Sequence, residues 1–319
     1  MSAESEVNPA PPSPGRRRRP PLAAILLLAW VMIACAAFLL VSPPPEPPAV
    51  DPDDQAIRER MANWAVRDAE QWTAREADLT LPWSEADGHL AIVIDDVGRE
   101  LELFDKLLAL RFELSFSVLP NSVFATGVQQ RLRSDHRRPR EILLHLPMEP
   151  LNPEAMTGVE AEEQFLLATD SPEQLRAKVL AALERVPVAR GVNNHMGSRL
   201  TADPTAMAAI MPVLRQRGLY FLDSRTHPGT VAATEAEAAA VPTISRKVFL
   251  DHVSDRAAIR SALAEAADYA REQPTVAIAH PSIELVEILR EELPRLHAEG
   301  VAIYPLSRLL ADQHQPTDP

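Results

Sequence analysis

The sequence has 319 residues, of which 46% are hydrophobic, and its 45 acidic residues outnumber its 32 lysines and arginines to give a net charge of −13. That length holds enough material for one large α/β domain or two small ones. The acidic balance argues against binding to nucleic acid or to an anionic membrane surface, and favours a neutral or amine-bearing ligand. The single cysteine, Cys35, excludes an intramolecular disulfide and a cysteine-based zinc site.

The N-terminal region predicts a membrane anchor. Residues 1–21 form a proline-rich tail with the basic run Arg16–Arg19, and we expect them to be disordered and cytoplasmic. Residues 22–41 carry no charge and are long enough to span a bilayer. A cleaved signal peptide, with small residues around Cys35, is the alternative. The apolar run continues through Leu40 without a break, which favours an uncleaved single-pass anchor in the inner membrane and a C-terminal domain on the periplasmic side.

A linker and stem follow at residues 42–87. Residues 43–52 are rich in proline and form a stiff spacer. Residues 53–78 have a charged helical pattern, and the simplest interpretation is a stem, although they could also pack against the main domain or contact an envelope protein partner. We expect the globular domain to span residues 88–312, with a short disordered tail at 313–319.

Within the globular part, short β-type runs alternate with longer helical runs, which is typical of βαβ units and a parallel sheet. The expected strands are Leu90–Ile94, Leu114–Val118, Ile142–Leu146, Gly191–Val192, Tyr220–Leu222, Thr243–Ile244 with Val248–Leu250, Val276–Ala279 and Val301–Ile303. The expected helices are Leu101–Arg111, Val123–Arg133, Glu173–Arg185, Thr205–Arg217, Asp255–Gln273 and Ile283–Glu299. This pattern predicts an α/β fold of the (β/α) barrel type, distorted and seven-stranded or incomplete, with a doubly wound open sheet as the alternative. Glycine-rich motifs for dinucleotides or nucleoside triphosphates do not occur.

Acids and histidines stand where several expected strands end. Asp95 and Asp96 follow the first strand, and a buried acidic pair is costly unless a metal, a proton or hydrogen-bond donors compensate it. The simpler interpretation, that Asp96 only caps the next helix, needs one aspartate and leaves the other unexplained. His145, His195 and His280 end later strands. Because parallel strands bring their carboxyl ends to one face, we expect these groups to meet in one cleft.

This set of residue types indicates metal-assisted hydrolysis. One aspartate and two histidines suit a divalent ion such as Zn²⁺ and leave positions open for water and substrate. A nearby carboxylate can serve as general base, and a further histidine can protonate the leaving group. Serine hydrolase chemistry lacks support because no G-x-S-x-G motif surrounds Ser198.

Four runs resemble the divergent polysaccharide deacetylase family, which is related to the NodB-type carbohydrate esterases. They are Ile92–Gly98, Leu144–Pro150, Gly191–Ser198 and Phe221–Thr226, and the likeness extends from about residue 89 to residue 310. The resemblance implies a distorted (β/α) barrel of seven strands and deacetylase chemistry. It also implies that Asp95 is the base, Asp96 and His195 are metal ligands, and His280 is the acid.

The sequence departs from the better-known enzymes of this type at Arg199, where they have a second metal histidine four residues after the first. A cationic side chain cannot ligate a metal. His145 is the replacement we expect, with Glu149 or His252 as the fallback. Among the nearby polar residues, Asn194, Asp223, Arg225 and Glu149 are candidates for orienting ligands or binding substrate. Structural pairing of Asp223 with Arg225 is an equally good interpretation of those two.

The sequence therefore predicts a metal-dependent hydrolase that removes N- or O-acyl groups from an envelope carbohydrate. Arg199 keeps a second hypothesis open, in which the domain is an inactive carbohydrate-binding or regulatory module of an envelope complex. An amidase or peptidase acting on peptidoglycan would use similar metal chemistry.

Overall fold

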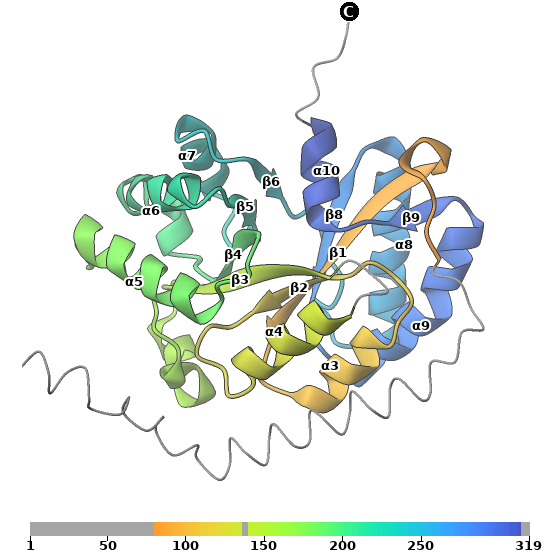
Figure 1. Cartoon of the computed structure of the whole chain (residues 1–319), viewed down its shortest axis with the longest axis horizontal. Helices are drawn as coiled ribbons and strands as arrows, with labels where there is room; N and C mark the ends of the chain where they lie inside the picture. The colour runs from red at the N-terminus through yellow and green to blue at the C-terminus, as the bar shows by residue number, and fades with distance from the viewer. Residues whose placement is uncertain (1–78, 136–139, 314–319) are drawn as a thin grey trace, which may run out of the picture. The chain divides into compact units, whose positions relative to one another are not determined.

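In the computed structural model of the protein, residues 79–135 and 140–313 are described. Their strands form one parallel sheet with helices around it (Figure 1). The strands are β1 (Gly88–Val97), β2 (Ser115–Val118), β3 (Glu141–Met148), β4 (Gly191–Met196), β5 (Tyr220–Asp223), β6 (Thr243–Ser245), β7 (Val248–Phe249), β8 (Thr275–Ala279) and β9 (Val301–Ile303). The helices are α3 (Leu101–Leu108), α4 (Ala125–Ser134), α5 (Pro172–Arg185), α6 (Pro204–Gln216), α7 (Ala232–Ala238), α8 (Arg256–Glu272), α9 (Ile283–Ala298) and α10 (Leu306–Gln313). Short 3₁₀ turns lie at Trp83–Glu85, Pro153–Met156, Gly158–Glu162 and Leu200–Ala202.

The strand order is that of a barrel that does not close. It runs β6-β5-β4-β3-β2-β1-β8-β7, and β9 adds to the first residues of β1. Because β8 returns to pair with β1, the order is cyclic, which supports the predicted (β/α) barrel over the doubly wound sheet. The barrel is of the incomplete form, since β6 and β7 do not pair with each other among the described residues.

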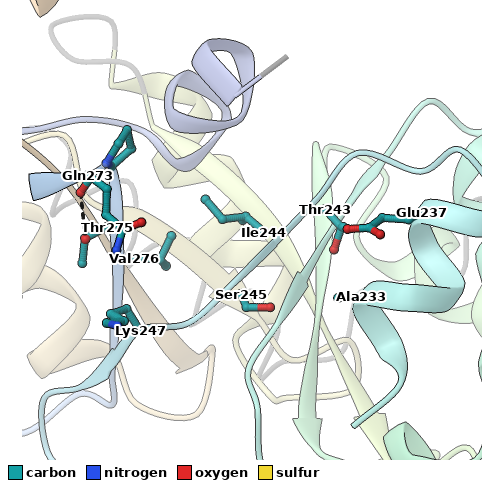
Figure 2. A pocket seen from close by; sticks show the side chains of 10 residues that line it. Ala233, Glu237, Thr243, Ile244, Ser245, Lys247, Gln273, Thr275 and Val276 are labelled. Atoms are coloured by element: carbon teal, nitrogen blue, oxygen red, sulfur yellow. Dashed lines mark hydrogen bonds between the residues drawn. The ribbon is translucent and has the colours of Figure 1, made fainter. Parts of the chain in front are cut away.

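The opening between β6 and β7 contains a cavity of about 290 Å³. Figure 2 shows Thr243 and Ser245 of β6 on one side, and Lys247 with Thr275 and Val276 of β8 on the other. The sequence pattern joined β6 and β7 into one interrupted strand. They are instead the two edges of the open sheet, since β6 pairs with β5 and β7 pairs with β8.

Local chemistry explains where the helices begin. Ser171 and Gln174 form a capping box at the start of α5, and side chains of Asp203 and Asp255 accept hydrogen bonds from the first turns of α6 and α8. Ser282 caps α9 in the same way. These caps lie between strand and helix, so they fix the loops at the carboxyl ends of the strands.

Two apolar layers hold the domain together. The larger one lies between the sheet and the surrounding helices, and it includes Leu90, Ile92 and Ile94 of β1. The smaller one includes Ala91 and Val93, the alternate residues of β1, together with residues of α10. A strand that is apolar at successive positions is buried on both faces, as expected for a parallel sheet.

Residues 79–87, which the sequence pattern places in the stem, belong to the packed domain. Leu79 and Leu81 pack against the two apolar layers, and the phenol of Tyr304 donates to the carbonyl of Leu81 at 2.9 Å. The Trp83 ring lies 3.9 Å from the His89 ring. The predicted membrane span at 22–41 and the helical stem at 53–78 lie outside the described residues. Among residues 79–135 and 140–313, no helix is long and apolar enough to cross a membrane.

Candidate metal centre

A bulge at the end of β1 turns two consecutive carboxylates toward one cavity. Neighbouring residues of a regular strand point to opposite faces of a sheet. Here the pairing of β1 with β2 shifts between Ile94 and Val97, and Asp96 has a φ of 54°. Asp95 and Asp96 consequently both line a cavity of about 510 Å³ at the carboxyl ends of the strands. Such left-handed backbone in a residue other than glycine is uncommon, and it often accompanies a functional constraint.

Three side chains from three strands converge at the wall of this cavity. Oδ1 of Asp96 lies 3.0 Å from Nδ1 of His195 and 3.2 Å from Nε2 of His145. The two histidine nitrogens are 3.1 Å apart. Oδ1 of Asp96 is buried, yet no group among the described residues donates a well-aligned hydrogen bond to it. The three atoms therefore face a common point.

This arrangement fits a divalent metal ion. Ligand atoms of a tetrahedral Zn²⁺ centre, with bonds of roughly 2.0–2.1 Å, lie about 3.3 Å from one another. The three separations observed here are close to that spacing, and the donor set of one carboxylate and two imidazoles suits such an ion. The unpartnered carboxylate oxygen is the atom that a cation would satisfy.

The second nitrogen of each imidazole is already fixed by a hydrogen bond. Nδ1 of His145 lies 3.0 Å from Oδ1 of Asn193, an oxygen that can only accept, so this nitrogen carries the proton and Nε2 keeps its lone pair. Nε2 of His195 lies 3.0 Å from Oε2 of Glu160. Such outer contacts select the tautomer in which the free nitrogen can bind a metal.

The surroundings of the two aspartates shift their pKa values in opposite directions. Burial raises the pKa of Asp95. The opposing effects, from the charges of His145 and His280 and from the hydrogen bond donated by Asn193, are smaller, so the pKa stays raised. Burial also acts to raise the pKa of Asp96, but contacts with His145 and His195 outweigh it and hold the pKa well below its usual range. Asp96 is therefore an anion, and Asp95 is the carboxyl with the greater affinity for a proton.

His280 faces the same cavity from the end of β8. Its Nδ1 lies 3.4 Å from Oδ2 of Asp251, which also accepts a hydrogen bond from the backbone N–H of His280 at 2.8 Å. Burial lowers the pKa of His280, but the contact with Asp251 and the charges of Asp96 and Asp95 raise it to about 8. His280 is therefore largely protonated at neutral pH.

The divergent polysaccharide deacetylase family matches residues 92–310. The chain belongs to this family. The resemblance found in the sequence is thereby confirmed.

Individual relatives agree with this assignment. The chain is 37% identical over 205 residues to the uncharacterized protein YibQ of Escherichia coli (strain K12), covering 64% of this chain and 62% of YibQ. It therefore spans less than two thirds of that relative. An uncharacterized protein of Haemophilus influenzae (strain ATCC 51907 / DSM 11121 / KW20 / Rd) is 35% identical over 219 residues, 68% of this chain and 75% of the relative. The crystal structure of uncharacterized protein ATU2773 from Agrobacterium tumefaciens C58 superposes with a TM-score of 0.62 at 25% identity, covering 72% of this chain and 93% of that one.

In this member of the deacetylase family, Arg199 has a partner of its own. Its Nη1 donates to Oε1 of Glu149 at 2.9 Å, while Oε2 of Glu149 accepts from the backbone N–H of Ala168 at 2.6 Å. The pair joins the loops after β3 and β4, and neither residue lines the cavity of the metal centre. Glu149, a candidate for substrate binding in the sequence, is occupied in loop packing. His145 stands beside Asp96 and His195 instead.

The other sequence candidates divide between the cavity and its supports. Asn194, Arg225 and His252 line the cavity. Asn194 also joins two loops, since its amide donates to the carbonyl of Met196 at 2.7 Å and its oxygen accepts from the N–H of Ser224 at 2.9 Å. Asp223 is fully buried, and it accepts hydrogen bonds from the backbone N–H of Arg225 at 2.8 Å and from Thr230 at 3.1 Å.

Sequence reasoning missed two supporting residues. Asn193 connects His145 to Asp95, because its amide donates to Oδ1 of Asp95 at 2.9 Å. It lies inside a motif that carried the family resemblance, so the signal was present. Glu160 lies in the short 3₁₀ turn Gly158–Glu162, where it accepts from Arg99 at 2.6 Å as well as contacting His195. No periodic pattern marks that loop.

Proposed function

We propose that this domain is a metal-dependent hydrolase that removes N- or O-acyl groups from an envelope carbohydrate. The observation that carries the proposal is the convergence of Asp96, His145 and His195, with the outer imidazole nitrogens fixed, next to the buried carboxyl of Asp95. Membership in the divergent polysaccharide deacetylase family supports the substrate class. Zn²⁺ is the ion that this donor set favours.

The proposed chemistry divides between the ion and the protein. A divalent ion held by Asp96, His145 and His195 would polarise the acyl carbonyl and make water more acidic. Asp95, whose pKa is raised by burial, takes the proton from the attacking water, and Asn193 holds its carboxyl in place. His280 gives a proton to the departing amine or alcohol oxygen, and Asp251 orients its ring. Two carboxyls with opposite pKa shifts are suited to separate roles.

Metal content and hydrolysis of acetylated glycan oligomers test the proposal together. We expect one divalent ion per chain in the wild-type protein, and loss of both the ion and deacetylation in Asp96→Ala and His195→Ala. His297→Ala is the matched control, because this histidine lies near the end of α9, outside the cavity lining. A wild-type protein that takes up no metal after incubation with Zn²⁺ would contradict the hydrolase and favour the inactive binding module.

We also propose that residues 22–41 anchor the domain in the inner membrane with its cavity on the periplasmic side. Support comes from the uncharged run and from the basic residues in front of it. Membrane fractionation of the full chain, followed by protease treatment of intact spheroplasts, tests this. Recovery in the soluble fraction, or protection of the domain from the protease, would contradict it.

A further inference from the structure

The cavity beside the metal centre has a cationic end. Arg225 follows β5 and Arg246 follows β6, and both line the cavity that holds Asp95, Asp96 and His280. In the described ranges 79–135 and 140–313, no carboxylate oxygen lies within 4.0 Å of either guanidinium. In a protein of net charge −13, two unpaired arginines in one cavity require an explanation.

Arg246 is held rigidly at this position. Its Nε donates to the carbonyl of Ser224 at 2.7 Å, and one terminal nitrogen donates to the carbonyl of Arg225 at 3.0 Å. The guanidinium lies over the Phe249 ring, 5.1 Å from its centre. The side chain thus connects the end of β5 to β7 across the opening of the sheet, and little conformational entropy remains to be lost on binding a ligand.

Arg225 is held by its backbone. Its φ of 50° is left-handed, and its N–H donates to the buried carboxylate of Asp223. Four described residues other than glycine have such a φ, and three of them, Asp96, Met196 and Arg225, line this cavity. Strained backbone of this kind persists where the surroundings impose it, and it is frequent at ligand sites.

The charges of Asp223 and Asp95 act on Arg246 without an ion pair to either carboxylate. Asp223 is buried and already accepts hydrogen bonds from the backbone N–H of Arg225 and from Thr230, while the Asp95 carboxyl accepts one from Asn193. Burial, and then the charge of Arg225, lower the pKa of Arg246 by more than the charges of Asp223 and Asp95 raise it. Arg246 is partly buried and Arg225 is exposed at the same cavity, and an anion bound between two like charges stabilises both of them.

We propose that Arg225 and Arg246 form a subsite for an oxyanion substituent, a carboxylate or a phosphate, on the glycan that enters the cavity. The planar guanidinium binds both groups through paired hydrogen bonds. This proposal rests on the proposed function, because it assumes that the ligand is a glycan. It adds that the sugar next to the acyl group that is removed is acidic.

Equilibrium binding to the full-length protein tests the subsite without turnover. The probes for calorimetric titration are N-acetylglucosamine, N-acetylglucosamine 6-phosphate and N-acetylmuramic acid. We expect at least one of the two acidic sugars to bind about tenfold or more tightly than the neutral sugar. The acidic sugar that binds more tightly identifies phosphate or carboxylate as the preferred group. Because no hydrolysis is measured, a protein without deacetylase activity still gives a clear result.

Variants of the two arginines test whether they cause the preference for acidic sugars. In Arg225→Gln we expect the preference for acidic sugars to fall about tenfold, and Arg246→Gln should behave alike. Arg246→Gln loses two hydrogen bonds to carbonyls and could fail to fold. Arg225 is exposed, so Arg225→Gln still tests the subsite in that case. Lys247→Gln is the control, because its ammonium lies 4.2 Å from the centre of the Tyr269 ring and lines the other cavity (Figure 2). Equal affinity of wild type for neutral and acidic sugars, an unchanged preference in Arg225→Gln, or an equal loss in Lys247→Gln would overturn the subsite.

Discussion

Asp95 and Asp96 are adjacent in the chain but differ sharply in environment. Asp96 faces two imidazoles, whereas Asp95 contacts the amide of Asn193 inside the sheet. The bulge in β1 makes this difference possible, since a regular strand would direct one of them outward. Neighbouring carboxyls whose pKa values are pushed apart are a recurrent feature of hydrolytic sites.

Asn193→Ala should weaken metal binding although Asn193 is not a ligand. Its side-chain oxygen accepts from Nδ1 of His145, and it also contacts Ser117. Without that acceptor the His145 ring is free to take the other tautomer, in which Nε2 carries the proton. We expect a loss of about 10–100-fold in Zn²⁺ affinity, measured by chelator competition. Asn121→Ala, a substitution outside the cavity lining, should leave the affinity unchanged. Unchanged affinity in Asn193→Ala would contradict the orienting role.

His280 should titrate near pH 8 in the metal-free protein, and Asp251→Asn should lower that value. The Asp251 carboxylate raises the pKa of His280, whereas burial lowers it. Without the carboxylate, the effect of burial is opposed less and the pKa falls. Deacetylation that depends on protonated His280 is retained below the pKa that His280 has in the metal-loaded enzyme and declines above it. The declining alkaline limb should therefore move to lower pH in the variant. NMR titration gives the pKa directly.

Asp268→Asn is the control for that titration, because it removes an exposed carboxylate on α8 that pairs with Arg271 at 3.0 Å. A His280 pKa that is the same in wild type and Asp251→Asn would contradict the assigned cause. An alkaline limb that stays in place while the pKa moves would show that another group supplies the proton.

The sequence predicted much of the cavity because parallel strands bring their ends together. Asp95, Asp96, His145, His195 and His280 all line it. Glu160 and Arg246 could not be predicted in the same way. Glu160 reaches His195 from a turn without periodicity, and Arg246 lies in the connection across the open edge of the sheet. Their positions depend on loop geometry, which a single sequence does not encode in a regular pattern.

At the level of elements, α10 fills the inside of the sheet. Leu306 and Leu309 are fully buried in the inner apolar layer, and Glu141 of β3 accepts from the N–H of Ser307 at 2.9 Å. The sequence pattern did not predict this helix, because eight residues before a polar tail give only two turns of periodicity. Similarly, α7 is seven residues long and rich in alanine, so it carries little amphipathic signal.

Leu309→Ala should destabilise the domain by about 2–5 kcal/mol, because it leaves a cavity in the inner layer that the strands cannot collapse to fill. Urea denaturation measures the change in the free energy of unfolding. Ser307→Ala is the control, since the N–H of Ser307 contacts Glu141 through the backbone; the expected change is within about 0.5 kcal/mol. A loss below about 1 kcal/mol in Leu309→Ala would show that α10 is not needed to fill the sheet.

Over the whole molecule, the open edge between β6 and β7 is the feature that sequence reasoning resolved least. Both strands are short, and β-type residues alone do not reveal whether two consecutive strands pair with each other or with earlier neighbours. Strand pairing is a tertiary property, decided by which apolar faces the surrounding helices cover. The family resemblance implied a distorted barrel, and the strand order shows where its closure is missing.

This open edge should be the least stable part of the sheet. Strands β6 and β7 have three and two residues and each pairs with one neighbour, whereas β1 has ten residues and pairs with β2, β8 and β9. Amide hydrogen exchange at residues 243–250 should therefore be faster than at residues 90–97. Arg246 connects the edges by binding two carbonyls of the β5 loop, so an acidic sugar bound to it should slow exchange at 243–250 in wild type and not in Arg225→Gln. Equal protection of both segments without ligand would show that the opening does not weaken the sheet.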